Sequence, residues 1–233
     1  MPRYKAPRII GGIAKLFFSL FILSVCGLLV WRVFISTKVP DSVRPIKKTD
    51  ELTAAYETYG KDLILRYQEQ ASITRGENNY GYFSVTSCVF IPQANQVQIV
   101  FRYNNSTIKN LAKDYGLTEL PKKSEHLFDV TLVKTTDLTP DNNADDLDPA
   151  TLHSERIFPS GEPIREETPL YTYYRYIFNG VTIEELTDAI YVDVYYVGAL
   201  NYEQRPYGTL CIYTWDEEWL PYKLSKEEKN LFS

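Results

Sequence analysis

The sequence predicts a mainly β protein: an N-terminal transmembrane helix followed by an antiparallel β-sandwich, of which an immunoglobulin-like sandwich is one form, with a few short helices. Two patterns lead to this prediction: one long uncharged apolar run, and seven later segments in which apolar and polar residues alternate. The composition of the 233 residues, 44% apolar and 24% charged, is that of a globular protein. We divide the chain into a basic tail (1–15), a membrane helix (16–35), a linker (36–49) and an outer domain (50–233).

The apolar run has the length that a bilayer requires. Leu16 to Trp31 contains no charged residue, and the apolar residues 33–35 continue the run beyond Arg32. Twenty helical residues rise about 30 Å, which is the thickness of the hydrocarbon core. A cleaved signal peptide is the alternative, because basic residues precede the run, but the pair of small residues that signal peptidase needs is missing at its exit. We therefore expect residues 16–35 to remain and to span the membrane.

The distribution of charge predicts the orientation of the chain. The first 36 residues carry a net charge of +5, and the remaining 197 carry −10. Four basic residues precede Leu16, which favours a cytoplasmic N-terminus and an extracytoplasmic C-terminal domain at the cell membrane. The acidic outer part lacks the clustered positive charge that nucleic-acid binding needs, so nucleic acid is excluded as a partner.

Past the membrane helix, the linker is expected to be extended, because Pro40 and Pro45 interrupt it and no period is present. A short helix then follows, with Asp50 as its N-cap and Gly60 as its left-handed C-terminal residue. Its shared apolar face comprises Leu52, Ala55, Tyr56 and Tyr59.

Alternation with a period of two predicts seven strands after Gly60. The second and third form a hairpin across Pro92–Asn95. The predicted strands are Leu63–Gln68, Tyr82–Ile91, Gln96–Tyr103, Phe128–Leu132, Leu170–Phe178, Ile190–Tyr196 and Leu210–Thr214.

Three further short helices are predicted among the strands. The first begins at Ser106 or Thr107 and ends at Tyr115, and the second covers Thr182–Asp188. The third is C-terminal and starts at Ser225, where the S-x-x-E spacing with Glu228 is typical of a capping box.

One stretch carries a resemblance to a known group of proteins. The sequence QVQIVFRYNNSTIKNL, from Gln96 to Leu111, together with the N-terminal anchor, resembles uncharacterised single-pass membrane proteins of Gram-positive, clostridial-type bacteria. The resemblance implies a location in the cell envelope. It implies no activity and no catalytic residue.

No motif predicts an enzyme or a cofactor. The two histidines, His126 and His153, have no Cys or His companions at the spacing of a metal site. Nucleophile-elbow, phosphate-loop and dinucleotide-binding patterns are all missing from the sequence. An enzyme that assembles carboxylates from distant strands is the third functional hypothesis.

The acidic loop contains a partial calcium motif. Asp141, Asn143 and Asp145 match the start of a calcium-binding loop, in which alternate side chains supply oxygen ligands. Asp146 replaces the turn glycine and Leu152 replaces the bidentate glutamate of that loop. A solvated acidic loop is the alternative interpretation.

Cys88 and Cys211 lie on predicted strands outside the membrane, and each is expected opposite the aliphatic face of its strand. A disulfide between them would form if their strands were neighbours in one sheet. Two reduced, half-buried thiols are the alternative.

Aromatic residues are concentrated near the C-terminus and suggest a ligand site. Tyr213, Trp215 and Trp219 surround a group of carboxylates, an arrangement that could stack on a glycan or contact a protein. Packing within the second sheet is the other explanation for these rings. We expect a membrane-anchored domain that contacts another envelope or membrane protein, with a glycan- or ligand-binding module as the alternative.

Overall fold

The computed structural model describes residues 6–68, 71–75, 83–135, 154–183, 189–202, 206–213 and 219–230. The chain divides into two compact units, with the boundary between Lys38 and Val39.

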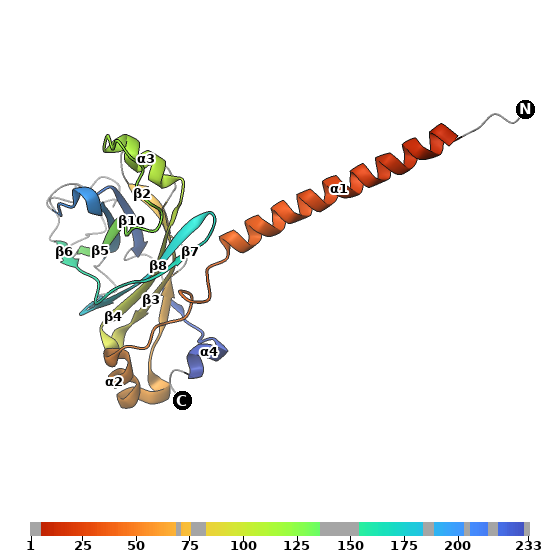
Figure 1. Ribbon diagram of the computed structural model, residues 1–233. Helices are drawn as coiled ribbons and strands as arrows, with labels where there is room; N and C mark the ends of the chain where they lie inside the picture. The colour runs from red at the N-terminus through yellow and green to blue at the C-terminus, as the bar shows by residue number, and fades with distance from the viewer. Residues whose placement is uncertain are drawn as a thin grey trace, which may run out of the picture. The chain divides into compact units, whose positions relative to one another are not determined.

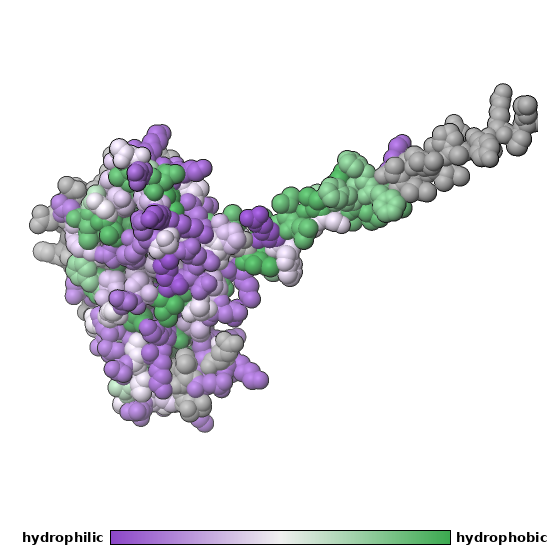
Figure 2. Space-filling view, in the orientation of Figure 1, coloured by the Kyte–Doolittle hydropathy of each residue, from purple (hydrophilic) through white to green (hydrophobic). Residues whose placement is uncertain are grey.

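In its described residues, the first unit consists of helix α1 (Ala6–Thr37), coloured red to orange in Figure 1. Its segment Lys15–Ile35 is long and apolar enough to cross a membrane or to act as a signal sequence, and its side chains are exposed. Figure 2 shows the apolar surface along this segment. The prediction of one apolar N-terminal helix is confirmed.

The second unit is built on two antiparallel sheets, seen as two groups of strands in Figure 1. In the described part of the chain, sheet A has the central order β3-β4-β8-β7, with β1 paired to β3 and β11 paired to β1, and sheet B has the order β10-β9-β5-β6. The short strand β2 (Ala71–Arg75) pairs with β3 of sheet A and β10 of sheet B. The other strands are β1 (Arg66–Gln68), β3 (Phe83–Ile91), β4 (Gln96–Asn104), β5 (Phe128–Thr135), β6 (Ser154–Ile157), β7 (Ile164–Glu167), β8 (Tyr171–Asn179), β9 (Ala189–Tyr196), β10 (Gly208–Tyr213) and β11 (Leu220–Pro221).

The predicted hairpin is confirmed as β3 and β4. Its connection is a three-residue 3₁₀ turn, Pro92–Ala94, followed by Asn95 with a φ of 46°. Asparagine is one of the few residues that adopt this left-handed conformation readily, because its side chain bonds locally. The turn therefore brings Gln96 opposite Ile91.

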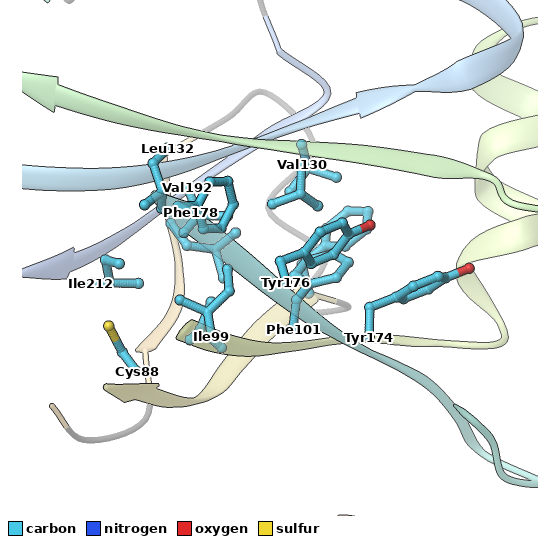
Figure 3. Close-up of a cluster of buried hydrophobic side chains, with 14 of the residues drawn as sticks. Cys88, Ile99, Phe101, Val130, Leu132, Tyr174, Tyr176, Phe178, Val192 and Ile212 are labelled. Carbon is cyan, nitrogen blue, oxygen red and sulfur yellow. The ribbon is translucent and has the colours of Figure 1, made fainter. Parts of the chain in front are cut away.

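The main core takes side chains from the inner faces of both sheets. Figure 3 shows Phe101 and Tyr176 of sheet A together with Val130 and Val192 of sheet B in this cluster. Many of its members are aromatic, and the rings of Tyr103 and Phe128 meet edge to face at 4.9 Å. The tyrosines that the sequence concentrates on β8 thus serve largely as core residues.

A β-bulge changes which residues of β3 face this core. The register shifts between Val85 and Ser87, so the inward residues change from Phe83 and Val85 to Cys88 and Phe90. A single extra residue moves all later side chains to the opposite face. The uninterrupted aliphatic face expected from Phe83 to Ile91 is therefore wrong, and Val89 and Ile91 pack on the outer side of sheet A.

Helix α2 (Asp50–Tyr59) is confirmed, with one correction at its start. The N-cap is Thr49 rather than Asp50, because the Thr49 hydroxyl accepts a hydrogen bond from the Leu52 amide. Gly60 has a φ of 55°, as its predicted role requires. Tyr59 is exposed, so the apolar face is narrower than expected.

Two other predicted helices are also present. Helix α3 (Thr107–Asp114) follows β4, and helix α4 (Lys226–Lys229) lies near the C-terminus. Ser225 and Glu228 form the predicted capping box, each side chain bonding the other residue's amide. The predicted helix Thr182–Asp188 lies largely outside the described residues.

The segment predicted as a linker belongs to the folded domain. Val43 and Ile46 are fully buried against the outer face of sheet A. We call Val39–Lys48 the strap. Local sequence offers no period here, because its contacts are made to distant strands rather than to a regular element of its own.

Candidate functional site

The aromatic site predicted near the C-terminus is part of the core where it is described. Tyr213 and Trp219 are 1% and 9% exposed, and their rings stack with centroids 4.9 Å apart. Phe90 packs against Trp219 at 5.7 Å. These two rings therefore present no stacking surface for a ligand, while Trp215 lies outside the described residues.

The predicted metal and histidine positions yield no site in the part of the chain that the structure describes. Asp141, Asn143, Asp145 and His153 fall outside it. The His126 ring lies edge-on to Tyr174 at 5.5 Å, and burial lowers the pKa of His126. Within the described ranges, no three His, Cys, Asp or Glu side chains are grouped to hold a metal ion.

Cys88 and Cys211 are reduced in the structure and pack in different clusters. Cys88 lies in the main core, where burial raises its pKa to about 12. Cys211 packs with Val133, Ala189 and Tyr191 on the other side of sheet B, because it pairs with Tyr191 and alternates with the core residue Leu210. The bulge in β3 turns Cys88 into the core, whereas Cys211 keeps the side opposite the aliphatic residues of its strand, so the two thiols do not share the face that the predicted disulfide requires.

A different group of side chains comes together on the outer face of sheet B. We call it the Arg156 cluster, and it contains Asp129, Arg156, Phe158, Tyr195 and Tyr202. Asp129 of β5 pairs with Tyr195 of β9, so both side chains point to the same face. Arg156 comes from the edge strand β6, while Phe158 and Tyr202 follow β6 and β9 in connecting segments.

Aromatic rings hold the Arg156 guanidinium in place. Its Cζ lies 5.6 Å from the Tyr195 ring centroid and 5.8 Å from that of Tyr202, within the range of a cation–π contact. Arg156 also donates a 2.7 Å hydrogen bond to the Tyr202 carbonyl. Tyr202 in turn meets Tyr195 and Phe158 edge to face, at 5.0 and 5.1 Å. The arginine is thus ordered before anything binds it.

Two carboxylates accept hydrogen bonds from the hydroxyl groups of these tyrosines. The Tyr202 hydroxyl donates to Asp129, and the Tyr195 hydroxyl donates to Asp193 at 3.4 Å. Thr209 adds a 2.8 Å bond to Asp193. Burial raises the pKa of Asp193, and it also raises the pKa of Tyr195 and of Tyr202 to about 12. Both phenols therefore stay protonated at neutral pH and keep donating.

The cluster is partly open to solvent. Arg156 is exposed and Phe158 is 50% exposed, whereas Tyr195 and Asp193 are buried. Val197 and Leu200, in the segment that leads to Tyr202, are exposed as well. The exposed part of the cluster therefore consists of the Phe158 ring and the Arg156 guanidinium. The tyrosines between them are held by hydrogen bonds to the carboxylates of Asp129 and Asp193.

Tyr195 is the one member of this cluster that a sequence pattern marks, because it alternates with the aliphatic residues of the predicted strand Ile190–Tyr196. Arg156 was missed because β6 is a four-residue edge strand without alternating hydrophobicity. Tyr202 and Phe158 lie outside regular elements, where no periodicity could indicate a role.

Comparisons with protein-family models, curated proteins and solved structures find no match to this chain. The structure defines the class of the protein as an N-terminal apolar helix followed by a domain of two antiparallel sheets.

Proposed function

We propose that this protein is a membrane-anchored domain of the cell envelope that binds another protein through the outer face of sheet B. The Arg156 cluster is the observation that carries the proposal. Arginine and tyrosine are the residues that dominate binding energy at protein interfaces, particularly where their side chains are ordered in advance. The half-exposed Phe158 beside them adds apolar area of the kind found at interface centres.

The proposed topology places the N-terminus in the cytoplasm and residues 39–233 outside. The excess of basic residues before α1 supports it. A protease added to intact cells should then release the outer domain by cutting near Lys38. Protection of the domain in cells whose surface proteins are digested would reverse the orientation.

We also propose that the outer domain is an immunoglobulin-like sandwich. Its strand order supports this proposal. The run β3-β4-β8-β7 corresponds to A-B-E-D of that fold, and β10-β9-β5-β6 corresponds to G-F-C-C′. The Arg156 cluster would then lie on the GFCC′ sheet.

Photo-crosslinking in the native cell tests the protein-binding proposal. A benzophenone side chain at position 158 should crosslink to one neighbouring membrane protein, because Phe158 lies at the exposed rim of the cluster. The same probe at Tyr59, an exposed residue of α2, is the matched control. Arg156→Ala should weaken the product at 158. Equal products at both positions, or none at 158, would contradict the proposal.

A glycan is the second candidate ligand, and the observation in its favour is the half-exposed Phe158 ring, which contacts Tyr202 in the same cluster as Arg156 and Asp129. An aromatic face can stack on a sugar ring, while the guanidinium donates to hydroxyl groups and the carboxylate accepts from them. A glycan-array signal that is lost in Phe158→Ala would favour this candidate. Trp219→Ala is unsuited to the test, because that ring belongs to the core.

A further inference from the structure

The strap is held on sheet A by two apolar side chains. Val43 is fully buried against Val100 and Tyr173, in a cluster separate from the main core. Ile46 is 1% exposed and packs with Leu52, Val89 and Ile91. These contacts fix the strap to the outer face of the sheet.

Side chains of sheet A bind the backbone of the strap. Arg175, on β8, donates to the carbonyl oxygens of Val43 and Arg44 at 2.7 and 2.6 Å. Gln98, on β4, accepts from the Lys47 amide and donates to the Lys47 carbonyl, both at 2.8 Å. Burial lowers the pKa of Arg175 to about 10, so the guanidinium remains charged at neutral pH. The strap thus supplies acceptors that a buried cation needs.

The C-terminal segment completes the attachment. The Glu228 carboxylate accepts from the Ile46 amide and from the Tyr222 hydroxyl, each at 2.7 Å. It also accepts from the Ser225 amide at 2.8 Å. Residues near the two ends of the domain are therefore joined at one buried carboxylate.

The strap is separable from the rest of the fold. None of its residues belongs to the main core between the sheets. The chain after it has its own attachments, because Gln96 donates to the Thr49 hydroxyl at 2.9 Å and Asn179 donates to Glu51 at 2.6 Å. Detachment of the strap would therefore stop at Thr49 and leave the two sheets closed.

We infer that the strap is a releasable clasp that sets the length of free chain between the membrane helix and the outer domain. When it is docked, Val39 packs in the same cluster as Val43 and Ser42 donates to Glu166, so Lys38 alone separates the end of α1 from the strap. When it is released, the free chain runs to Lys48, and eleven residues reach up to about 39 Å. The strap is the covalent link to α1, so tension on the domain passes through it. The inference rests on the proposed function only for the source of that tension, a bound partner.

Hydrogen exchange on the full chain in detergent micelles tests the clasp. In Val43→Asp, the amides of Ile46 and Lys47 should exchange about 100-fold faster or more, because an unpaired carboxylate is not tolerated in the apolar site. Strands β4 and β8 should keep their protection. Lys48→Asp is the control, because it places the same carboxylate at an exposed strap position. It should leave the exchange rates of the strap amides and of β4 and β8 unchanged.

Trypsin provides a second readout. It should cut the wild-type strap region after Lys38, and Val43→Asp should add cuts after Lys47 and Lys48. Gln98→Ala is the alternative variant if Val43→Asp does not accumulate, and it should speed exchange of the Lys47 amide in particular. Loss of protection in β4 and β8 together with the strap would overturn separability. Unchanged protection of the strap in both variants would overturn the clasp itself.

Discussion

The outer faces of the two sheets each carry an arginine among tyrosines, yet their environments are opposite. Arg175 on sheet A is 1% exposed, and three acceptors of the same chain surround its guanidinium. Arg156 on sheet B is exposed and lies on two rings, with one hydrogen bond to a carbonyl. The first arginine holds the docked strap, whereas the second is exposed, as the proposed binding of a partner requires. An arginine's role therefore depends on what covers it.

The largest expected effect is the difference in stability between variants of these two arginines. Arg175→Ala should lower the free energy of unfolding by about 3 kcal/mol or more, because it leaves the buried acceptors of the strap and Gln98 unpaired. Arg156→Ala should cost at most about 1 kcal/mol, the value of an exposed cation–π contact. Urea unfolding of the outer domain from Val39 onward measures both. Similar losses of stability in the two variants would contradict the proposed difference between Arg175 and Arg156.

Glu228→Gln should come next, at about 2 kcal/mol at neutral pH, because hydrogen bonds to a charged group are lost or weakened. Burial by itself would raise the pKa of Glu228, but the bonds from Ile46, Tyr222 and Ser225 outweigh it and lower the pKa below its ordinary value of 4.5. The stabilisation is therefore present above that value and is lost as the pH falls through the lowered pKa. Unfolding curves from pH 7 to pH 3 should show the wild type and the variant converging on the acidic side. A pH-independent difference would refute the assignment.

Asp193→Asn should have a smaller effect of opposite sign. Burial raises the pKa of Asp193, so its ionised form destabilises the fold at neutral pH, and wild-type stability from this group increases as the pH falls. The variant should gain about 1 kcal/mol at pH 7, and the gain should shrink toward acidic pH. Denaturant midpoints at pH 7 and pH 4 give the comparison. A loss at pH 7 would mean that the bonds from Thr209 and Tyr195 depend on the charge.

The smallest expected effect is a difference in reactivity between the thiol of Cys88, in the core, and that of Cys211, on the outer face of sheet B. Cys211, which is partly exposed, should react with a thiol reagent in the native domain faster than Cys88, which is buried with a pKa of about 12. Labelling followed by peptide mapping separates the two rates. The denatured, unreduced outer domain should contain two free thiols, and a count of zero would establish the disulfide between Cys88 and Cys211 instead.

Sequence alone determined the elements whose signals are local. The uncharged run predicted α1, the alternation on both sides of Pro92–Asn95 predicted the hairpin, and Ser225 with Glu228 predicted the start of α4. In each case the decisive interactions connect residues close in the chain, so spacing and composition are enough to reveal them.

Only the tertiary structure decided which faces are buried and which side chains meet. The bulge in β3 exchanged the inward and outward residues of one strand, and no local pattern marks it. Arg175 and Val43 are 132 positions apart, and Glu228 and Ile46 are 182 apart. Because these contacts join distant segments, the docking of the strap produces no periodic pattern in the sequence. The Arg156 cluster likewise arises from separate strands and loops. Such contacts depend on how the sheets fold together, which is a property of long-range packing rather than of any one segment.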